Sequence, residues 1–192
     1  MSDEFLNRKT DLNKNDEVNF INTNARSLCP KIHSLIDSFE ELQLTFGTIT
    51  ETWLADGEGL EEDLQDLALG AGLGMICRNR EPGRNGVAHG GVALVYRNNI
   101  SDFKKICVPN PGNFEILPCI GTIRGHSRKM VVVSCYLPPN YPTRRGKEAL
   151  EYITNVIVQI KRKYTDPYLV VTGDFNQWEV DDSLADLSLI HI

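Results

Sequence analysis

The sequence predicts an α/β fold, and three observations carry that prediction. Short apolar segments alternate with amphipathic segments in which apolar residues recur at spacings of three and four. Residues 130–136 are apolar at nearly every position, which is typical of a strand buried on both faces. Hydrophobic residues make up 41% and charged residues 24% of the 192, which excludes collagen-like, coiled-coil and wholly disordered classes. A chain of this length corresponds to one domain.

The first predicted unit is a strand, a helix and a second strand. Val18–Ile21 forms a short strand, an amphipathic helix begins at Pro30 and runs to Leu42, and Phe46–Ile49 forms the next strand. A right-handed crossover places the carboxyl ends of two such strands on the same side. Asn24 and Glu51 are therefore expected at neighbouring strand ends, where α/β sheets bind ligands.

The rest of the chain continues the alternation. A second amphipathic helix spans 150–160 and is followed by Lys161–Lys163, which suits a helix C-terminus. The acidic run 58–66 is interpreted as a solvated helix face, and 177–192 predicts at most a short helix. Residues 1–16 are expected to be a flexible lead-in, and 17–192 the domain. Further strands are predicted at 75–77, 92–96, 114–123, 130–136 and 168–171.

The net charge of −6 argues against a nucleic-acid partner only until its distribution is considered. Seven acids lie between Glu51 and Asp66 and five between Asp174 and Asp186, with no Lys or Arg in either stretch. Without those twelve acids the remainder has a net charge of +6. Bulk charge therefore decides nothing about partners.

No apolar run is long enough to span a membrane, and the N-terminal residues lack the apolar core of a signal peptide. The five cysteines are an odd number without CxxC spacing, which favours reduced thiols. These features predict a soluble, intracellular protein with no membrane partner.

Polar residues follow four of the apolar strands: Asn24, Glu51, Tyr136, and Asp174 with Asn176. Together they suit phosphodiester chemistry. Glu51 can hold Mg²⁺ (or Mn²⁺), Asp174 can accept a proton from water, and the amides and the phenol can donate hydrogen bonds to a phosphate. Taken singly, each has an ordinary alternative, such as a turn, a solvated acid or a core tyrosine.

The strings FINTNARSL, ITETWL, SCYLPP and VVTGDFN resemble the successive motifs of the endonuclease/exonuclease/phosphatase superfamily. The resemblance runs from about Val18 to Trp178 and is closest to the endonuclease domain of LINE-type non-LTR retrotransposons. It implies a four-layer α/β sandwich of two packed, mostly antiparallel sheets flanked by helices. It also implies Mg²⁺-dependent cleavage of phosphodiesters.

The resemblance also assigns roles to the residues. Asn24 lies near the metal and the phosphate, Glu51 is the metal ligand, and Tyr136 contacts the phosphate. Asp174 positions or activates the attacking water, and Asn176 is its partner in the Asp-x-Asn pair. In this family branch the substrate is DNA, and a reverse transcriptase domain accompanies the nuclease in the full-length element. The expected location is the nucleus if the chain acts on DNA and the cytoplasm otherwise, and the oligomeric state is left open.

One departure from the family pattern is expected to matter. The family domain continues past GDFN to a terminal Ser-Asp-His motif, whereas no histidine here follows an aspartate, and His191 is too near Asn176. The chain is therefore expected to be truncated and to lack the last strands. Whether it is an active enzyme stays open between three hypotheses: a DNA-nicking endonuclease, a degenerate and weakly active or inactive fragment, and a phosphodiesterase or phosphatase of another branch.

Basic residues flank the expected site in two segments predicted to be loops. They are interpreted either as ordinary surface charges or as groups that follow the phosphates of a substrate. Trp53 and Trp178 are expected to pack the floor of the site. The basic residues are Arg78, Arg80 and Arg84 in the first segment and Arg144, Arg145 and Lys147 in the second, of which Arg84, Arg144, Arg145 and Lys147 are the candidate substrate contacts.

Overall fold

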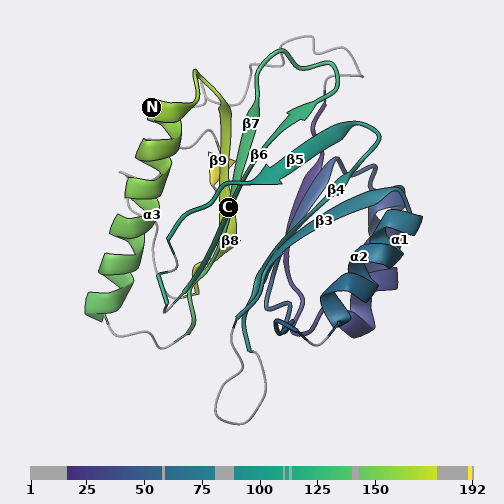
Figure 1. The fold of residues 1–192 in the computed structure, drawn as a ribbon, viewed down its shortest axis with the longest axis horizontal. Coiled ribbons are helices and arrows are strands. Elements are labelled where there is room, and N and C mark those ends of the chain that lie inside the picture. The colour runs from purple at the N-terminus through teal and green to yellow at the C-terminus, as the bar shows by residue number, and fades with distance from the viewer. Residues whose placement is uncertain are drawn as a thin grey trace, which may run out of the picture.

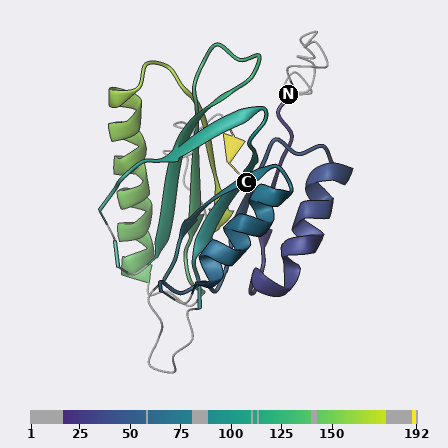
Figure 2. The same cartoon turned by 45° about the vertical axis from the view of Figure 1, so that its right-hand side comes forward.

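The computed structural model has four layers, which lie side by side in Figure 1. Helix α3 (Thr143–Lys163) covers one outer face, two β-sheets pack against each other in the middle, and α1 (Ile32–Glu41) and α2 (Leu60–Gly70) cover the other outer face. The turned view of Figure 2 shows α1 and α2 next to each other on the same sheet. The predicted α/β sandwich is confirmed. The structure describes residues 17–57, 59–80, 89–109, 111–112, 114–139, 143–176 and 190–191.

The first sheet has the strand order β1-β2-β4-β3. β1 and β2 are parallel because α1, preceded by a 3₁₀ turn at Cys29–Lys31, makes the crossover between them. Asn24 is the register partner of Thr50, so Asn24 and Glu51 do lie at adjacent strand ends. The four strands are β1 (Phe20–Asn24), β2 (Phe46–Thr50), β3 (Leu73–Arg78) and β4 (Val92–Arg97), with β4 antiparallel to both neighbours.

The second sheet has the order β5-β6-β7-β8-β9. β7 and β8 are parallel, and their last residues, Tyr136 and Asp174, are register partners. The strands are β5 (Ser101–Lys105), β6 (Glu115–Ile123), β7 (Met130–Tyr136), β8 (Tyr168–Asp174) and β9 (Ile190–His191), with β5, β6 and β7 antiparallel in turn.

Three apolar cores fill the spaces between the layers. β7 contributes to two of them: Val131 and Val133 pack with α3, whereas Val132 and Tyr136 pack between the sheets. All seven residues of β7 are buried, so the prediction of a strand covered on both faces is confirmed.

The structure differs from the predicted elements at three places. Helix α3 begins at Thr143 and not at Leu150, because its first turns are too polar to show a helical apolar period; Arg144 and Arg145 are exposed, and Ala149 is buried. β5 was not predicted, and β9 lies where at most a short helix was expected. The lead-in 1–16, Arg84 and Trp178 lie outside the described residues. No helix in the described part of the chain has the length and hydropathy to cross a membrane.

Candidate active site

The candidate site lies at one edge of the sandwich, where parallel strand pairs from both sheets end. Asn24 is the last residue of β1, and Glu51 directly follows β2. Tyr136 and Asp174 end β7 and β8 in the other sheet. The topology thus gathers residues from four strands at one edge, as the strand-end pattern predicts.

The side-chain amide of Asn24 contacts carboxylates from both sheets. Its Nδ2 donates to Glu51 Oε1 at 2.9 Å and to Asp174 Oδ2 at 2.8 Å. Its Oδ1 accepts a hydrogen bond from the backbone N–H of Arg26 at 3.1 Å, which fixes the orientation of the amide. Two carboxylates are therefore held close together on a solvent-accessible edge, with a neutral donor between them.

Tyr136 approaches the same carboxylate from the second sheet. Its hydroxyl donates to Glu51 Oε1 at 3.2 Å, and its side chain is buried. Burial and the neighbouring charge of Glu51 raise the pKa of Tyr136 well above its usual range. The phenol therefore stays protonated and can act as a hydrogen-bond donor throughout the physiological pH range.

Asn176 connects the end of β8 to the segment after β7 by hydrogen bonds. Its backbone N–H donates to Asp174 Oδ1 at 3.1 Å, and its Nδ2 donates to the carbonyl of Leu137 at 2.7 Å. Both carboxylate oxygens of Asp174 thus accept hydrogen bonds. All five predicted site residues belong to one connected network.

A second polar network, which the sequence reasoning missed, joins the two sheets behind the site. Asn22 Nδ2 donates to the carbonyl of Gly173 at 2.9 Å, and Thr48 Oγ1 donates to Asn22 Oδ1 at 3.0 Å. The hydroxyls of Thr48 and Thr172 lie 3.5 Å apart. Because buried polar groups require partners, these bonds set the relative position of the sheets. The signal available in the sequence was polar residues at alternate positions of otherwise apolar strands.

Glu51 is held in an unusual backbone conformation. Its φ is 53° and that of Trp53 is 56°, both in the left-handed region that non-glycine residues rarely adopt. The backbone N–H groups of Ser27 and Leu28 donate to the carbonyls of Glu51 and Thr52 at 2.9 and 3.0 Å. Such strain persists only where the surroundings hold it, and it is typical of functional sites. The Trp53 ring packs edge-on against His89, 4.8 Å between centroids.

The donor set fits a hard divalent cation. Within the described residues, no group of three or more His, Cys, Asp or Glu side chains is clustered as a closed metal cage. Mg²⁺ does not need one, since it is usually held by one or two carboxylates together with waters and phosphate oxygens. Glu51 and Asp174 present carboxylates at this edge, and the amide of Asn24 lies beside both.

The structure separates the basic residues into two groups. Arg78 Nη1 donates to the carbonyl of Ile116 at 2.9 Å, and Arg80 pairs with the buried Glu115 at 3.3 Å. The side chains of both arginines therefore make contacts within the protein. Arg144, Arg145 and Lys147 are exposed in the first turns of α3, at the end of the molecule where β7 and β8 terminate (Figure 1). Arg144 pairs with Glu148 at 2.9 Å.

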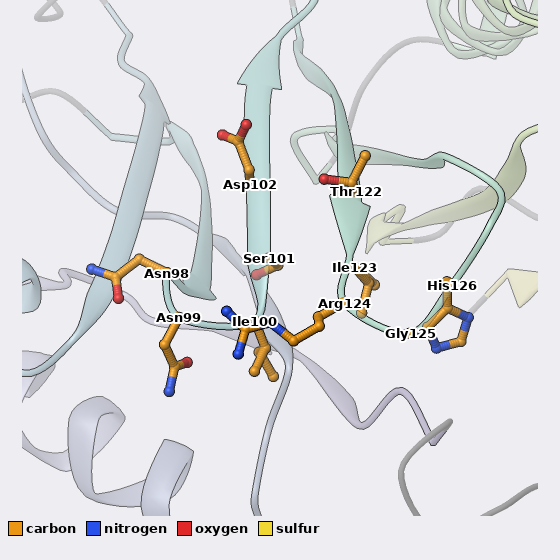
Figure 3. Close-up of a pocket in the computed structure, with 10 residues that line it drawn as sticks. All are labelled: Asn98, Asn99, Ile100, Ser101, Asp102, Thr122, Ile123, Arg124, Gly125 and His126. Carbon is orange, nitrogen blue, oxygen red and sulfur yellow. The ribbon is translucent and has the colours of Figure 1, made fainter.

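Two hollows help to delimit the site. One, of about 410 Å³, lies between β1 and α1, reaches Asn24 and is lined by apolar residues such as Ile21 and Leu35. The other, of about 320 Å³, lies at the opposite end of β6, between the turns before β5 and after β6. Figure 3 shows the Arg124 side chain of this second hollow extending across to Ile100 in the turn before β5. None of the five site residues lines it.

Comparison with protein-family models shows the family of this chain. A family model described as the endonuclease/exonuclease/phosphatase family matches residues 17–190, and the chain therefore belongs to that family. A search of curated proteins found no match.

Solved structures share the fold at low sequence identity. A family protein from Bacteroides thetaiotaomicron superposes with a TM-score of 0.68 at 13% identity, over 88% of this chain and 68% of that one. The 3′ phosphatase NExo from Neisseria, bound to a product DNA hairpin, gives 0.56 at 15% identity, over 80% and 56%. D. rerio TDP2 with a single-stranded DNA product gives 0.58 at 14% identity, over 88% and 64%. The chain thus spans less than two thirds of the length of the last two.

Proposed function

We propose that this chain is a divalent-metal-dependent phosphodiesterase that cleaves DNA, an endonuclease of LINE-type retrotransposon origin that nicks one strand. The observation that carries the proposal is the placement of Asn24 between Glu51 and Asp174, with the Tyr136 hydroxyl on the same Glu51 oxygen. Two of the structurally similar proteins were solved with DNA products, which supports DNA as the substrate class. Nuclear action and an attached reverse transcriptase domain belong to the same proposal.

Each residue then has a chemical task. Glu51 would hold Mg²⁺ or Mn²⁺, with the Asn24 amide beside it, and the ion would neutralise charge developing on the phosphate. Asp174 accepts a proton from the attacking water or orients it. The Asn176 backbone N–H, which donates to Asp174 Oδ1 at 3.1 Å, holds the carboxylate in place. With substrate bound, the Tyr136 hydroxyl and the Asn24 amide, which donate to the two carboxylates in this structure, would donate to phosphate oxygens instead.

The test is the conversion of supercoiled plasmid to the nicked form in Mg²⁺ or Mn²⁺. We expect Glu51→Ala to reduce the rate by about 100-fold or more, since a bound metal ion contributes several kcal/mol to the transition state. Glu62→Ala, which removes an acid from the exposed face of α2, is the matched control. Cleavage at the full rate in Glu51→Ala would refute the assignment.

A second candidate function is a fragment with the same site but weak turnover. Within the described residues, no histidine hydrogen-bonds to any of the five site residues, so the network contains no imidazole to protonate a leaving group. A missing acid or base typically costs about 10²- to 10⁴-fold. Single-turnover rates with excess enzyme distinguish the candidates, because the fragment hypothesis predicts metal binding with very slow cleavage or none. The third hypothesis is a phosphodiesterase or phosphatase of another branch of the family. Assays with inositol phosphates and sphingomyelin as substrates test it.

A further inference from the structure

Glu115 is a buried carboxylate next to the site for which the proposed chemistry has no use. It opens β6, is 4% exposed and is the register partner of Tyr136. Its Oε1 pairs with Arg80 Nη1 at 3.3 Å, and the carboxylate also accepts a hydrogen bond from the backbone N–H of Gly91. Burying a carboxylate is costly unless it is paired, so a retained one calls for a specific role.

Two glycines beside Glu115, Gly90 and Gly91, lie in a space too narrow for a side chain. Gly90 and Gly91 have φ values of +110° and +85°. A Cβ on Gly90 would lie 3.0 Å from Glu115 Oε1, and one on Gly91 would lie 2.4 Å from Thr52 Oγ1. The Gly90–Gly91 segment therefore fits between Glu115 on one side and Thr52 on the other.

The same two glycines hold the residues that follow Glu51. The carbonyl of Gly90 accepts a hydrogen bond from the backbone N–H of Trp53 at 2.9 Å, and that of Gly91 accepts one from Thr52 at 3.4 Å. The left-handed Glu51 is thus supported from two sides: by the segment after β1, and by the Gly90–Gly91 segment that Glu115 anchors. Loss of either support would release the strained backbone.

We infer that Arg80 and Glu115 are positioning residues that, through the Gly90–Gly91 segment, hold Glu51 in the conformation that binds the metal. The inference rests on the proposed function, because only there is Glu51 a metal ligand. Groups that orient metal ligands typically change metal affinity or activity by about 10- to 100-fold when they are removed. An ion pair with a merely structural role would change stability and leave metal affinity unaltered.

The experiment measures binding of Mn²⁺ to the full chain by isothermal titration calorimetry, with plasmid nicking as a second readout. We expect Arg80→Ala to weaken Mn²⁺ binding about tenfold. The matched control is Arg128→Ala: Arg128 pairs with Asp166 at 2.7 Å, its side chain is 37% exposed against 36% for Arg80, and it precedes β7 at the end opposite Tyr136. Arg80→Lys, which keeps the charge, should recover part of the affinity.

The outcomes separate the two proposals. If Arg80→Ala binds Mn²⁺ as tightly as Arg128→Ala, the pair is only structural and the inference is wrong, whatever the melting temperature. If the wild-type chain neither binds Mn²⁺ nor nicks DNA, the proposed function fails and the inference fails with it. Should Arg80→Ala not fold, Glu115→Gln and Arg80→Gln carry the same comparison. Glu115→Gln keeps the side-chain length and removes the negative charge, and Arg80→Gln removes the positive charge but keeps a polar side chain.

Discussion

Single residues at the site each make several contacts. Asn24 bonds to carboxylates of both sheets, and Asp174 accepts bonds through both of its oxygens. The Tyr136 hydroxyl donates to a carboxylate that already accepts a bond from Asn24. Because each group restricts its neighbours, the carboxylates are preorganised, which is how electrostatic stabilisation of a transition state is achieved at low reorganisation cost.

Glu115 gives a prediction for the pH dependence of stability. Burial raises the pKa of Glu115 to about 7, although the charges of Arg80 and Arg78 act in the opposite direction. Between the unfolded pKa, about 4.3, and 7, the native state binds more protons than the unfolded state. The stability due to this group is thus fully present below about pH 4.3 and is lost as pH rises to about 7.

We expect the melting temperature of Glu115→Gln to fall less than that of the wild type between pH 5 and pH 8, measured by differential scanning calorimetry. Glu148→Gln, which changes an exposed acid on α3, is the control and should follow the wild type. A parallel fall in wild type and Glu115→Gln would contradict the assignment of a raised pKa to Glu115.

At the level of elements, the site depends on how closely β7 and β8 approach at their ends. Gly173 precedes Asp174 and has a φ of +150°, and a Cβ there would lie 1.9 Å from the backbone oxygen of Cys135. A side chain at this position would separate the two strands and displace Asp174.

We expect Gly173→Ala to lower the free energy of unfolding by about 3 kcal/mol or more, measured by urea denaturation. Gly70→Ala is the matched control: Gly70 is the last residue of α2, and a Cβ there meets nothing within 4 Å. This helix substitution should be neutral or stabilise by up to about 1 kcal/mol. Equal stabilities of the two variants would show that the close approach at Gly173 is unimportant.

The first turns of α3 give a prediction about DNA binding. Arg145 and Lys147 are exposed at the end of the molecule that carries the site. Each phosphate contact contributes about 0.9 to the slope of log affinity against log salt. We expect Arg145→Ala with Lys147→Ala to reduce that slope by about 2 in binding to duplex DNA. The exposed Lys161 and Arg162 at the other end of α3 are the control pair; an equal effect there would mean nonspecific attraction.

For the whole molecule, the central point is that both sheets contribute to one site. Glu51 comes from the first sheet and Asp174 and Tyr136 from the second, and the contacts of Asn22 with Gly173 and of Thr48 with Thr172 join the sheets behind them. A cation that binds Glu51 beside Asp174 would therefore bridge the two halves of the sandwich and stabilise the folded state.

We expect Mg²⁺ at 100 times its dissociation constant to stabilise the fold by about 2.7 kcal/mol, which corresponds to a rise of about 5–10 °C in melting temperature. Glu51→Ala should abolish the shift. Asp63→Ala, from the acidic first turn of α2, should retain it. A shift that survives in Glu51→Ala would place the bound ion elsewhere.

Much of the fold and of the site follows from local pattern. The apolar run 130–136 predicted a doubly buried strand, and the apolar period after Pro30 predicted α1, which together with two short strands placed Asn24 beside Glu51. β5 escaped prediction because only Ser101 and Phe103 of its five residues are buried, which leaves a weak signal. The first turns of α3 escaped because most of their residues are exposed, and the two that are buried, Gly146 and Ala149, are too small to give an apolar period.

Strand alternation and strand-end residues are local properties of the chain, so the sequence alone sufficed to predict the α/β class and five polar residues at strand ends. The sandwich of two packed sheets was predicted from the resemblance of the motifs to a known family. The hydrogen bonds that connect Asn24 to both carboxylates, and the pairing of Arg80 with Glu115, required the tertiary structure. The physical reason is that burial and partnership depend on contacts between residues far apart in the chain. Glu115 falls within the predicted strand 114–123, and only the packing of the Gly90–Gly91 segment and Arg80 against it makes it a buried, paired carboxylate.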